Sequence, residues 1–337
     1  MTNTIKEFLS QIGWDQCHQE PLPMDCSKRR YIRLYKGDHT RLLMIDPPPS
    51  GKLDLYIQIA NILKAGGFRV PEIFDTQPTQ GLALIEDFGT QTFTVALQQG
   101  IPHEDLYEMA LNVLMSLRTQ YPASPALGLP TFSPALIAQE LDIFLDWYVP
   151  MTTGKQTPSS AGQDLKDLVV ALWQQATATH PAVLVLRDFH IDNLMVVQGG
   201  THQTRCGLLD FQDALIGPAA YDLTSLLQDS RLKMPRSVRE NCLKRYAQTF
   251  GDHDTLMRAY HVTGAQRNIK NLGIFARMFQ RDHQDRYLQF IPRLWQNLSE
   301  NLSHPTLDDV RYWLDSNVHL AKGYANTETI DNCRFSV

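Results

Sequence analysis

The stretch that decides the fold runs from residue 186 to residue 214 and reads LRDFHIDNLMVVQGGTHQTRCGLLDFQDA. Two short apolar runs, NLMVV and RCGLLDF, flank the segment QGGTHQ, whose glycines supply the positive backbone angles that a hairpin turn needs. Acidic residues stand at the outer ends of both runs. Because an unpaired charge beside a core is costly, acids in these positions indicate a function.

The geometry of this predicted hairpin favours a magnesium site. Folding the two runs about the middle of the turn places Asn193 opposite Asp210, and directly opposed residues have β-carbons about 5 Å apart. An amide oxygen and a carboxylate suit Mg²⁺, which proteins hold with one or two carboxylates, substrate phosphates and water. Asp188 could face the same space, where a cation would relieve the repulsion between two carboxylates. Each residue alone could instead cap a turn.

Composition and charge limit the classes of function. The chain has 337 residues, 43% of them hydrophobic and 20% charged, which is typical of a soluble globular protein with about two lobes. A net charge of -5 without a basic block predicts no nucleic-acid partner and no membrane partner. Five widely separated cysteines without a CxxC motif indicate neither a zinc site nor a disulfide framework. The N-terminus lacks a signal-peptide pattern, so a cytoplasmic protein is expected.

The order of predicted elements indicates an α+β protein with two lobes. Segments 29–35 and 41–46 read as an antiparallel hairpin, and a helix over 53–67 and a strand over 81–89 follow. From residue 91 the pattern is mostly helical, with amphipathic stretches at 103–120, 133–149, 163–178, 219–230, 235–250, 255–281 and 287–302. We therefore predict a small antiparallel-sheet N-lobe over residues 1–89 and a larger, mostly helical C-lobe over residues 90–337.

Three motifs in order make the chain resemble the aminoglycoside phosphotransferase and choline kinase family, which has a bilobal protein-kinase-like fold. LRDFHIDNLM resembles the family's catalytic loop, and the resemblance implies Asp188 as the catalytic base and Asn193 as a metal ligand. LLDFQDA resembles its metal-binding strand end, with Asp210 on magnesium. GPAAYDLTSLL resembles the following segment, where Asp222 would support the loop from a helix start. The resemblance covers nearly the whole chain, and it implies that the N-lobe binds nucleotide and that the C-lobe carries catalysis and substrate binding.

Further stretches are similar to one branch, the bacterial anomeric sugar kinases that phosphorylate N-acetylmuramate and N-acetylglucosamine in cell-wall recycling. They are SKRRYIRL, LLMIDPPP, GLALIEDFG, ELDIFLDWYV and QRNIKNLGIFARMFQRD. The branch implies ATP and Mg²⁺ as cofactors and a small amino sugar as the acceptor substrate, and we expect a monomer. Adenine would lie against the connection that contains Glu86 and Phe88, chiefly through backbone groups. Glu140, Trp147 and Arg267 are candidates for contacts with the sugar, although each could equally belong to a structural helix face.

Several positions depart from the family pattern. Leu186 replaces the His that commonly opens the catalytic loop, and Gln212 replaces the Gly of the protein-kinase DFG motif. Met44 stands where many kinases place a phosphate-pairing Lys, so the usual Lys–Glu ion pair cannot be assigned. Arg29, Arg30 or Lys28 could meet the phosphates instead, because a planar guanidinium can bind two phosphate oxygens at once. A solvated loop is the alternative for these three basic residues.

Other functions remain open from the sequence alone. Within the same fold, the acceptor could be an aminoglycoside, a choline-like amine or another sugar. The missing Lys–Glu pair also allows a degenerate nucleotide-binding scaffold. A glycosidase that uses two carboxylates explains the pattern less well, because it gives no role to Asn193.

Overall fold

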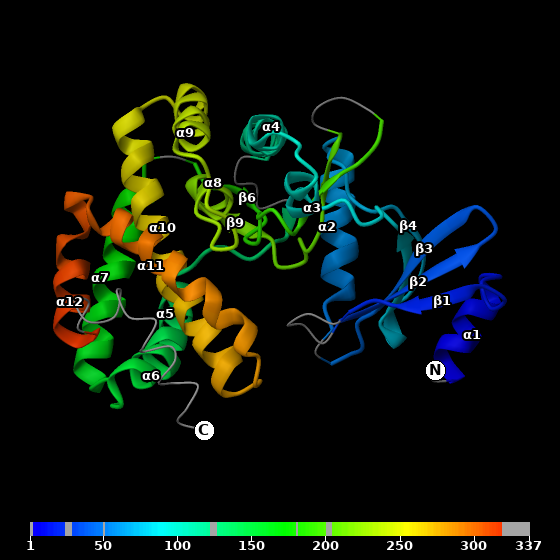
Figure 1. Cartoon of the computed structure of the whole chain (residues 1–337), viewed down its shortest axis with the longest axis horizontal. Helices are drawn as coiled ribbons and strands as arrows, with labels where there is room; N and C mark the ends of the chain where they lie inside the picture. Colours follow the sequence, from blue (N-terminus) through cyan, green and yellow to red (C-terminus); the bar gives the residue numbers. More distant parts are fainter. Residues whose placement is uncertain are drawn as a thin grey trace. The chain divides into compact units, whose positions relative to one another are not determined.

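The computed structural model describes residues 3–23, 29–49, 51–121, 127–179, 181–199 and 204–318. The chain forms two compact units (Figure 1). Unit 1 comprises Met1–Ser116 and Leu186–Ala214, and unit 2 comprises Leu117–Val185 and Leu215–Val337. The segment that decides the fold thus belongs to the same unit as the N-terminal sheet. The functional division into lobes 1–89 and 90–337 stays a prediction.

Unit 1 is built on a five-stranded antiparallel sheet in the order β1-β2-β3-β5-β4. The strands are β1 (His18–Pro21), β2 (Arg30–Lys36), β3 (His39–Ile45), β4 (Ile73–Gln77) and β5 (Leu82–Glu86). The predicted hairpin is confirmed, because β2 and β3 pair from Arg30↔Ile45 to Lys36↔His39. The edge strands β1 and β4 were not predicted, since most of their side chains face solvent and their sequences lack a hydrophobic alternation.

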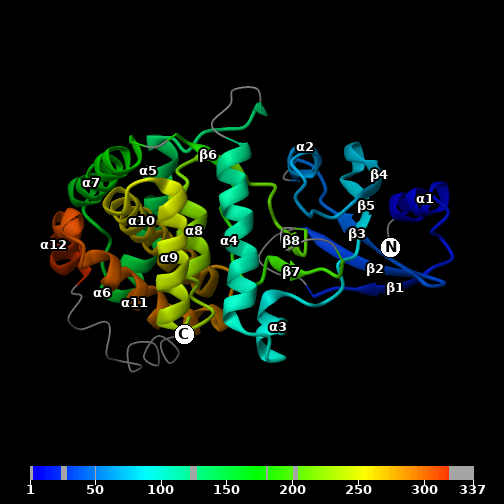
Figure 2. The ribbon, with the colours of Figure 1, turned by 90° about the horizontal axis from the view of Figure 1, so that it is seen from above.

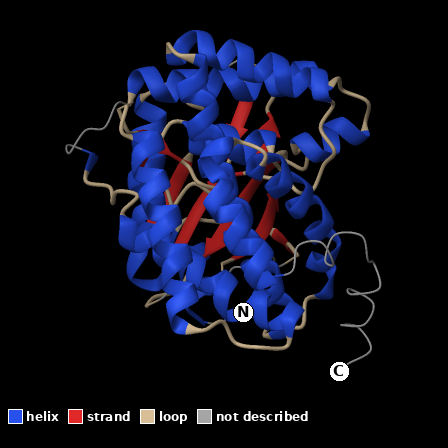
Figure 3. Ribbon diagram, turned by 90° about the vertical axis from the view of Figure 1, so that its left-hand side faces the viewer, coloured by secondary structure: helices blue, strands red, loops and turns tan. Residues whose placement is uncertain are grey.

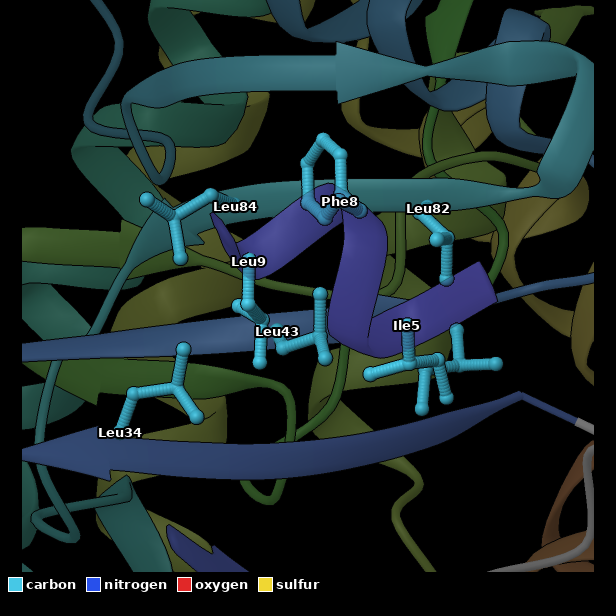
Figure 4. Close-up of a cluster of buried hydrophobic side chains, with 8 residues drawn as sticks. Ile5, Phe8, Leu9, Leu34, Leu43, Leu82 and Leu84 are labelled. Carbon is cyan, nitrogen blue, oxygen red and sulfur yellow. The ribbon is translucent and has the colours of Figure 1, made fainter. Parts of the chain in front are cut away.

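Helix α1 (Asn3–Gln11) covers this sheet with a short apolar stripe. Ile5, Phe8 and Leu9 follow the i, i+3, i+4 spacing of one helix face. They pack against leucines of three strands, and Figure 4 shows these side chains directed toward one another: Leu34, Leu43, Leu82 and Leu84. Removal of this apolar surface from water stabilises the sheet that carries the start of the candidate site.

Unit 1 also contains α2 (Leu53–Ala65), α3 (Phe93–Gln98) and the start of α4 (His103–Gln120), which continues into unit 2. The predicted hairpin of the 186–214 segment is present as β7 (Leu194–Val196) and β8 (Cys206–Leu208). Its strands also contact the N-terminal part of the chain: the Leu208 amide donates to the Arg69 carbonyl, and the Val196 amide donates to the Gln91 carbonyl. These bonds explain why the segment belongs to unit 1.

The register of this hairpin differs by one residue from the prediction. Leu194 pairs with Leu208, and the Leu209 amide donates to the Asn193 carbonyl, so Asn193 lies opposite Leu209 and not opposite Asp210. Asp210 follows the strand in a left-handed conformation, with φ 58°, and this turns the chain away from the ladder. Gly199 has the positive φ expected for the turn, at 81°. Gly200 lies outside the described residues.

Unit 2 is mostly helical, as the blue ribbons of Figure 3 show. The helix α10 (His253–Gln280) packs against most of the others (Figure 2), and the predicted helical stretches are confirmed. The other helices are α5 (Pro134–Ile143), α6 (Val149–Thr153), α7 (Ser159–Thr177), α8 (Ala220–Leu227), α9 (Arg236–Phe250), α11 (Ile291–Leu302) and α12 (Asp308–Val318). Two short strands, β6 (Val183–Val185) and β9 (Leu215–Gly217), pair in this unit. They were not predicted because three residues carry too little pattern.

A π-helical turn, η3 (Phe144–Tyr148), continues α5. A Cβ atom on Gly273 of α10 would lie 2.5 Å from the backbone nitrogen of Phe144, so a glycine is required for the approach of the two helices. Among the described residues, no helix combines the length and apolar character needed to cross a membrane.

Candidate active site

The loop between Leu186 and Asn193 is held by hydrogen bonds within itself. The Asn193 amide nitrogen Nδ2 donates to the Asp188 carbonyl at 3.0 Å and lies 3.2 Å from His190 Nε2. The backbone amide of Asn193 donates to the His190 carbonyl. Because these bonds hold Nδ2, the side-chain oxygen Oδ1 of Asn193 points away from the Asp188 carbonyl and could bind a cation.

Two residues of this region have a backbone conformation that L-residues rarely adopt. Arg187, directly before Asp188, has φ 70°, and Asp210 has φ 58°. A left-handed conformation in a residue other than Gly costs on the order of 1 kcal/mol, and such residues gather at functional sites. One strained residue, Arg187, therefore lies directly before the predicted catalytic base, and the other, Asp210, is itself a predicted metal ligand.

The carboxyl group of Asp210 experiences unfavourable electrostatics. Desolvation by the surrounding protein raises the pKa of Asp210 above its ordinary value, and the negative charge of Asp188 raises it further. The hydrogen bond from Gln212 and the charge of Arg29 lower it in part. The side chain is nevertheless 46% accessible to solvent. The two acids predicted from sequence are thus close enough to repel, and a cation that bound Asp210 would relieve this repulsion.

The buried guanidinium of Arg29 lies at the centre of a polar network in unit 1. Its Nη1 donates to Gln212 Oε1 at 2.7 Å and lies 3.5 Å from Asp210 Oδ1, and its Nη2 pairs with Asp46 Oδ2 at 3.3 Å. Gln212 Nε2 donates in turn to Asp210 Oδ1 at 2.9 Å. The network therefore places a buried cation beside a predicted metal ligand.

An ion pair that the sequence could not assign is found here. Met44 is fully buried in β3, between Tyr31 and Ala83. A methionine carries no charge, so this position cannot pair with a phosphate. Instead, Arg29 before β2 pairs with Asp46 after β3, and the backbone amide of Lys52 also donates to Asp46. An Arg followed by the hairpin and an Asp at its end is a signal that could have indicated this pair.

The other basic residues of the predicted phosphate-binding group are placed differently. Arg30 is exposed on β2, opposite Ile45, and successive side chains of an extended chain point to opposite sides, away from the Arg29 network. Lys28 lies outside the described residues. Lys52 was not predicted as a site residue, but its ammonium group pairs with Asp213, at the end of the 186–214 segment.

The connection after β5 is fixed by two bidentate pairs. Arg69 donates to both oxygens of Glu86, at 2.7 and 2.5 Å, and Arg33 donates to both oxygens of Asp87. Partial burial alone would raise the pKa of Glu86, but the bonds and charge of Arg69 outweigh this and hold it below its ordinary value. The Arg69 guanidinium also lies over the Phe88 ring, 4.6 Å from its centroid. The carboxylates of Glu86 and Asp87 are therefore both engaged by arginines within unit 1.

Two of the three candidates for sugar contacts belong to one buried cluster in unit 2. Glu140 of α5 pairs with Lys270 of α10 at 3.1 Å and accepts a bond from Gln266 at 2.7 Å. Lys270 reaches the Tyr221 hydroxyl at 3.4 Å, and the buried Arg267 guanidinium lies 5.7 Å from the Tyr221 ring centroid. The cluster thus joins Glu140 to Arg267 through Lys270 and Tyr221.

Trp147, the third candidate, lies elsewhere on the same helices. It belongs to the π-turn η3, is half-buried, and its carbonyl accepts a bond from Gln280 at 3.3 Å. Gln280 stands at the C-terminal end of α10, about 20 Å along the helix from Arg267.

Asp222 lies in the first turn of α8, as predicted, and is buried, with 3% of its surface exposed. An acid in the first turn is favoured by the positive end of the helix dipole. Burial raises the pKa of Tyr246, and the negative charge of Asp222 adds to this rise while Arg118 opposes it. The role of Asp222 in supporting the catalytic loop stays a prediction.

Comparisons with known proteins assign the chain to a family. A model of the phosphotransferase enzyme family matches residues 18–261, which is more than half of the chain. The chain belongs to this family. A protein of Pseudomonas aeruginosa named N-acetylmuramate/N-acetylglucosamine kinase is 33% identical over 309 residues, covering 88% of each chain. A protein of the same name from Caulobacter vibrioides is 29% identical and covers 91% of this chain and 94% of its own.

Solved structures confirm the predicted fold of this phosphotransferase. The choline kinase LicA from Streptococcus pneumoniae matches with a TM-score of 0.60 at 14% identity, covering 88% of this chain and 98% of its own. An ADP-bound aminoglycoside phosphotransferase matches with a TM-score of 0.60 at 12% identity, covering 89% and 99%. The α+β, protein-kinase-like architecture and the enzyme class predicted from the sequence are both confirmed.

Proposed function

We propose that the protein transfers the γ-phosphoryl group of ATP to the anomeric hydroxyl of an amino sugar, N-acetylmuramate or N-acetylglucosamine. The names of the relatives support this acceptor class, since they align over most of the chain. Such a reaction would belong to cell-wall recycling, and a monomeric cytoplasmic enzyme would suffice for it. Phosphoryl transfer needs little covalent participation from the protein, so catalysis consists mainly of positioning and charge stabilisation.

The observation that carries the proposal is the electrostatic relation between two acids in unit 1. The charge of Asp188 acts on Asp210, and Asn193 is bonded to the Asp188 carbonyl. In our assignment, Asp188 accepts the proton of the attacking hydroxyl, a role typically worth about 10²- to 10⁴-fold in rate. An anomeric hydroxyl is more acidic than an ordinary sugar hydroxyl, so a carboxylate suits this task.

The donor atoms around Asp210 fit Mg²⁺. Asp210 offers a carboxylate in a site of excess negative charge, and Asn193 offers its Oδ1. The described residues contain no group of three or more His, Cys, Asp or Glu that could hold a metal ion, which agrees with a magnesium bound mostly by phosphates and water. When bound, Mg²⁺ would neutralise charge on the phosphates. Asn193 and Asp210 would hold it.

The remaining roles follow from charge and position. Arg29 is our candidate for phosphate binding, because its guanidinium places a buried positive charge beside Asp210, the proposed metal ligand. Adenine would bind the backbone around Glu86 and Phe88. Arg30 remains a weaker candidate for the nucleotide, since it is exposed on the sheet.

We assign acceptor binding to unit 2. Arg267 is the candidate for the lactyl carboxylate of a muramic sugar, because a guanidinium can bind both carboxylate oxygens. Glu140 and Trp147 are the candidates for the sugar hydroxyls and ring, and Asp222 for support of the catalytic loop.

The test is an assay of ADP release with N-acetylmuramate, N-acetylglucosamine, choline and kanamycin as acceptors. We expect turnover with the amino sugars, and a loss of at least about 10²-fold in kcat for Asp188→Asn. Asp192→Asn is the matched control, because Asp192 lies in the same loop and its carboxylate accepts a hydrogen bond from Thr94. The amide oxygen of an asparagine can accept the same bond. Turnover of choline or kanamycin alone would refute the acceptor class. Full activity of Asp188→Asn would remove the catalytic base.

A further inference from the structure

Gln212 connects the two groups to which the proposed function gives the metal and the phosphates. Its side chain is buried, with 6% of the residue exposed. It accepts from Arg29 through Oε1 and donates to Asp210 through Nε2, and Nε2 also lies 3.4 Å from Asp213 Oδ2. The orientation of the amide is fixed by its partners, because a guanidinium only donates and a carboxylate only accepts.

The distances indicate that Gln212 separates a cation from an anion. Arg29 Nη1 approaches Gln212 Oε1 to 2.7 Å but stays 3.5 Å from Asp210 Oδ1. A short Arg–carboxylate bond would be 2.7–2.9 Å long and strong. The amide therefore occupies the position from which Arg29 and Asp210, which form only a long ion pair at 3.5 Å, would otherwise form a short hydrogen-bonded pair.

We propose that Gln212 is a positioning residue that keeps Arg29 and Asp210 apart, so that Asp210 stays available to the metal and Arg29 to the phosphates. This inference rests on the proposed function. A neutral amide suits the task because it satisfies a donor and an acceptor at once without adding charge. A side chain that only accepts would bind Arg29 and repel Asp210, and an apolar one would bind neither.

Two substitutions that keep the side chain nearly equal in size, Gln212→Met and Gln212→Glu, test the proposal, because we expect them to change the Mn²⁺ affinity differently. In Gln212→Met, Arg29 closes on Asp210 and competes with the metal, so Mn²⁺ affinity should fall about 10- to 100-fold, the range found when an outer-shell partner is lost. In Gln212→Glu, the introduced carboxylate holds Arg29 and adds negative charge, so Mn²⁺ binding should be equal or tighter. ADP binding without metal should weaken about tenfold in the same variant, the effect of losing one hydrogen bond to a charged group, because a second carboxylate besides Asp46 would then hold Arg29.

The measurements need no turnover. Mn²⁺ binding is followed by electron paramagnetic resonance and ADP binding by titration calorimetry on the full chain, with thermal unfolding to establish that each variant is folded. Gln77→Met is the matched control, because Gln77 lies on β4 in the same unit, at the far edge of the sheet. It should leave both affinities within about twofold, against the large change expected at Gln212.

Equal Mn²⁺ affinities of Gln212→Glu and Gln212→Met would overturn the inference. If Gln212→Met does not fold, Gln212→Glu decides alone, since it must keep Mn²⁺ binding and lose ADP affinity. Failure of the proposed function looks different: Mn²⁺ binding would then be insensitive to Asp210→Asn in the unmodified background.

Discussion

The buried ion pair between Glu140 and Lys270 makes a sharp prediction about stability. Glu140 is 4% exposed and Lys270 is 7% exposed, and their charged atoms lie 3.1 Å apart. Removal of one partner leaves the other charge buried and uncompensated, which typically costs 3–5 kcal/mol. We therefore expect Glu140→Gln and Lys270→Met to destabilise unit 2, whatever Glu140 does for the acceptor.

The part of each loss that comes from an unpaired buried charge has an upper limit, because the remaining partner can become neutral. At pH 7 a lysine with a reference pKa of about 10.4 loses its proton at a cost of about 4.6 kcal/mol, and this limits the loss in Glu140→Gln. A glutamic acid with a reference pKa of about 4.3 gains a proton at a cost of about 3.7 kcal/mol, and this limits the loss in Lys270→Met. For a unit of this size, either loss lowers the Tm by on the order of 10 °C.

The two variants should respond to pH with opposite signs. In Lys270→Met, folding raises the pKa of Glu140 above its unfolded value, so the loss of stability shrinks as pH falls from 7 towards 5. In Glu140→Gln, folding lowers the pKa of Lys270, so the loss shrinks as pH rises from 7 to 9. Thermal unfolding at pH 5.5, 7 and 9 measures both trends. The double variant should recover part of the loss.

Two outcomes would refute this reasoning. A Tm within about 1 °C of the wild type at pH 7 for Glu140→Gln would mean that the pair contributes no stability. The same pH trend in both variants would mean that neither remaining partner changes its protonation. An increase in the acceptor KM without a change in Tm would instead assign Glu140 to the substrate alone.

Three further substitutions test other parts of the molecule. Asp210→Asn should abolish turnover in a kinetic assay. In an unfolding assay the ligand-free variant should be as stable as the wild type or about 0.5 kcal/mol more stable, a figure that allows for solvent screening of a half-exposed group. Burial lowers the pKa of His261, although a hydrogen bond to Asn301 opposes this, so the free energy of unfolding should fall as pH drops from 7 towards 5. Urea unfolding of His261→Gln should show a smaller dependence of this free energy on pH. Gly207→Ala would place a Cβ atom 2.7 Å from the Phe88 ring and should cost about 1–3 kcal/mol in the same assay, and no loss would contradict the tight packing.

The sequence was sufficient for features that depend on local pattern. The amphipathic spacing of unit 2 predicts its helices, and the alternation in β2 and β3 predicts their hairpin. The order of acids and apolar runs in residues 186–214 predicts the hairpin, and the resemblance of its motifs to a known family indicates the enzyme class. Each of these inferences uses residues only a few positions apart, where backbone geometry restricts the possible structures.

Features that depend on distant side chains were beyond the sequence. Arg29 reaches Gln212 across 183 positions of the chain, and no local pattern encodes that contact. Charged residues on an amphipathic helix normally face solvent, so the burial of Glu140 depends on a lysine supplied by α10. The register of β7 and β8 differs by one residue from the prediction because the length of the connecting turn sets the register, and the sequence does not show where that turn begins and ends.

The acids of the 186–214 segment differ in how fully the protein compensates them. Asp192 accepts a bond from Thr94, and Asp213 pairs with Lys52. Asp210 instead shares Arg29 with Asp46 and Gln212, adopts a strained backbone, and keeps a raised pKa. Its incomplete compensation lowers the stability of the ligand-free protein but leaves negative potential for a cation. The cost of burying charge beside these strands is thus concentrated at the residue where a bound metal would remove it.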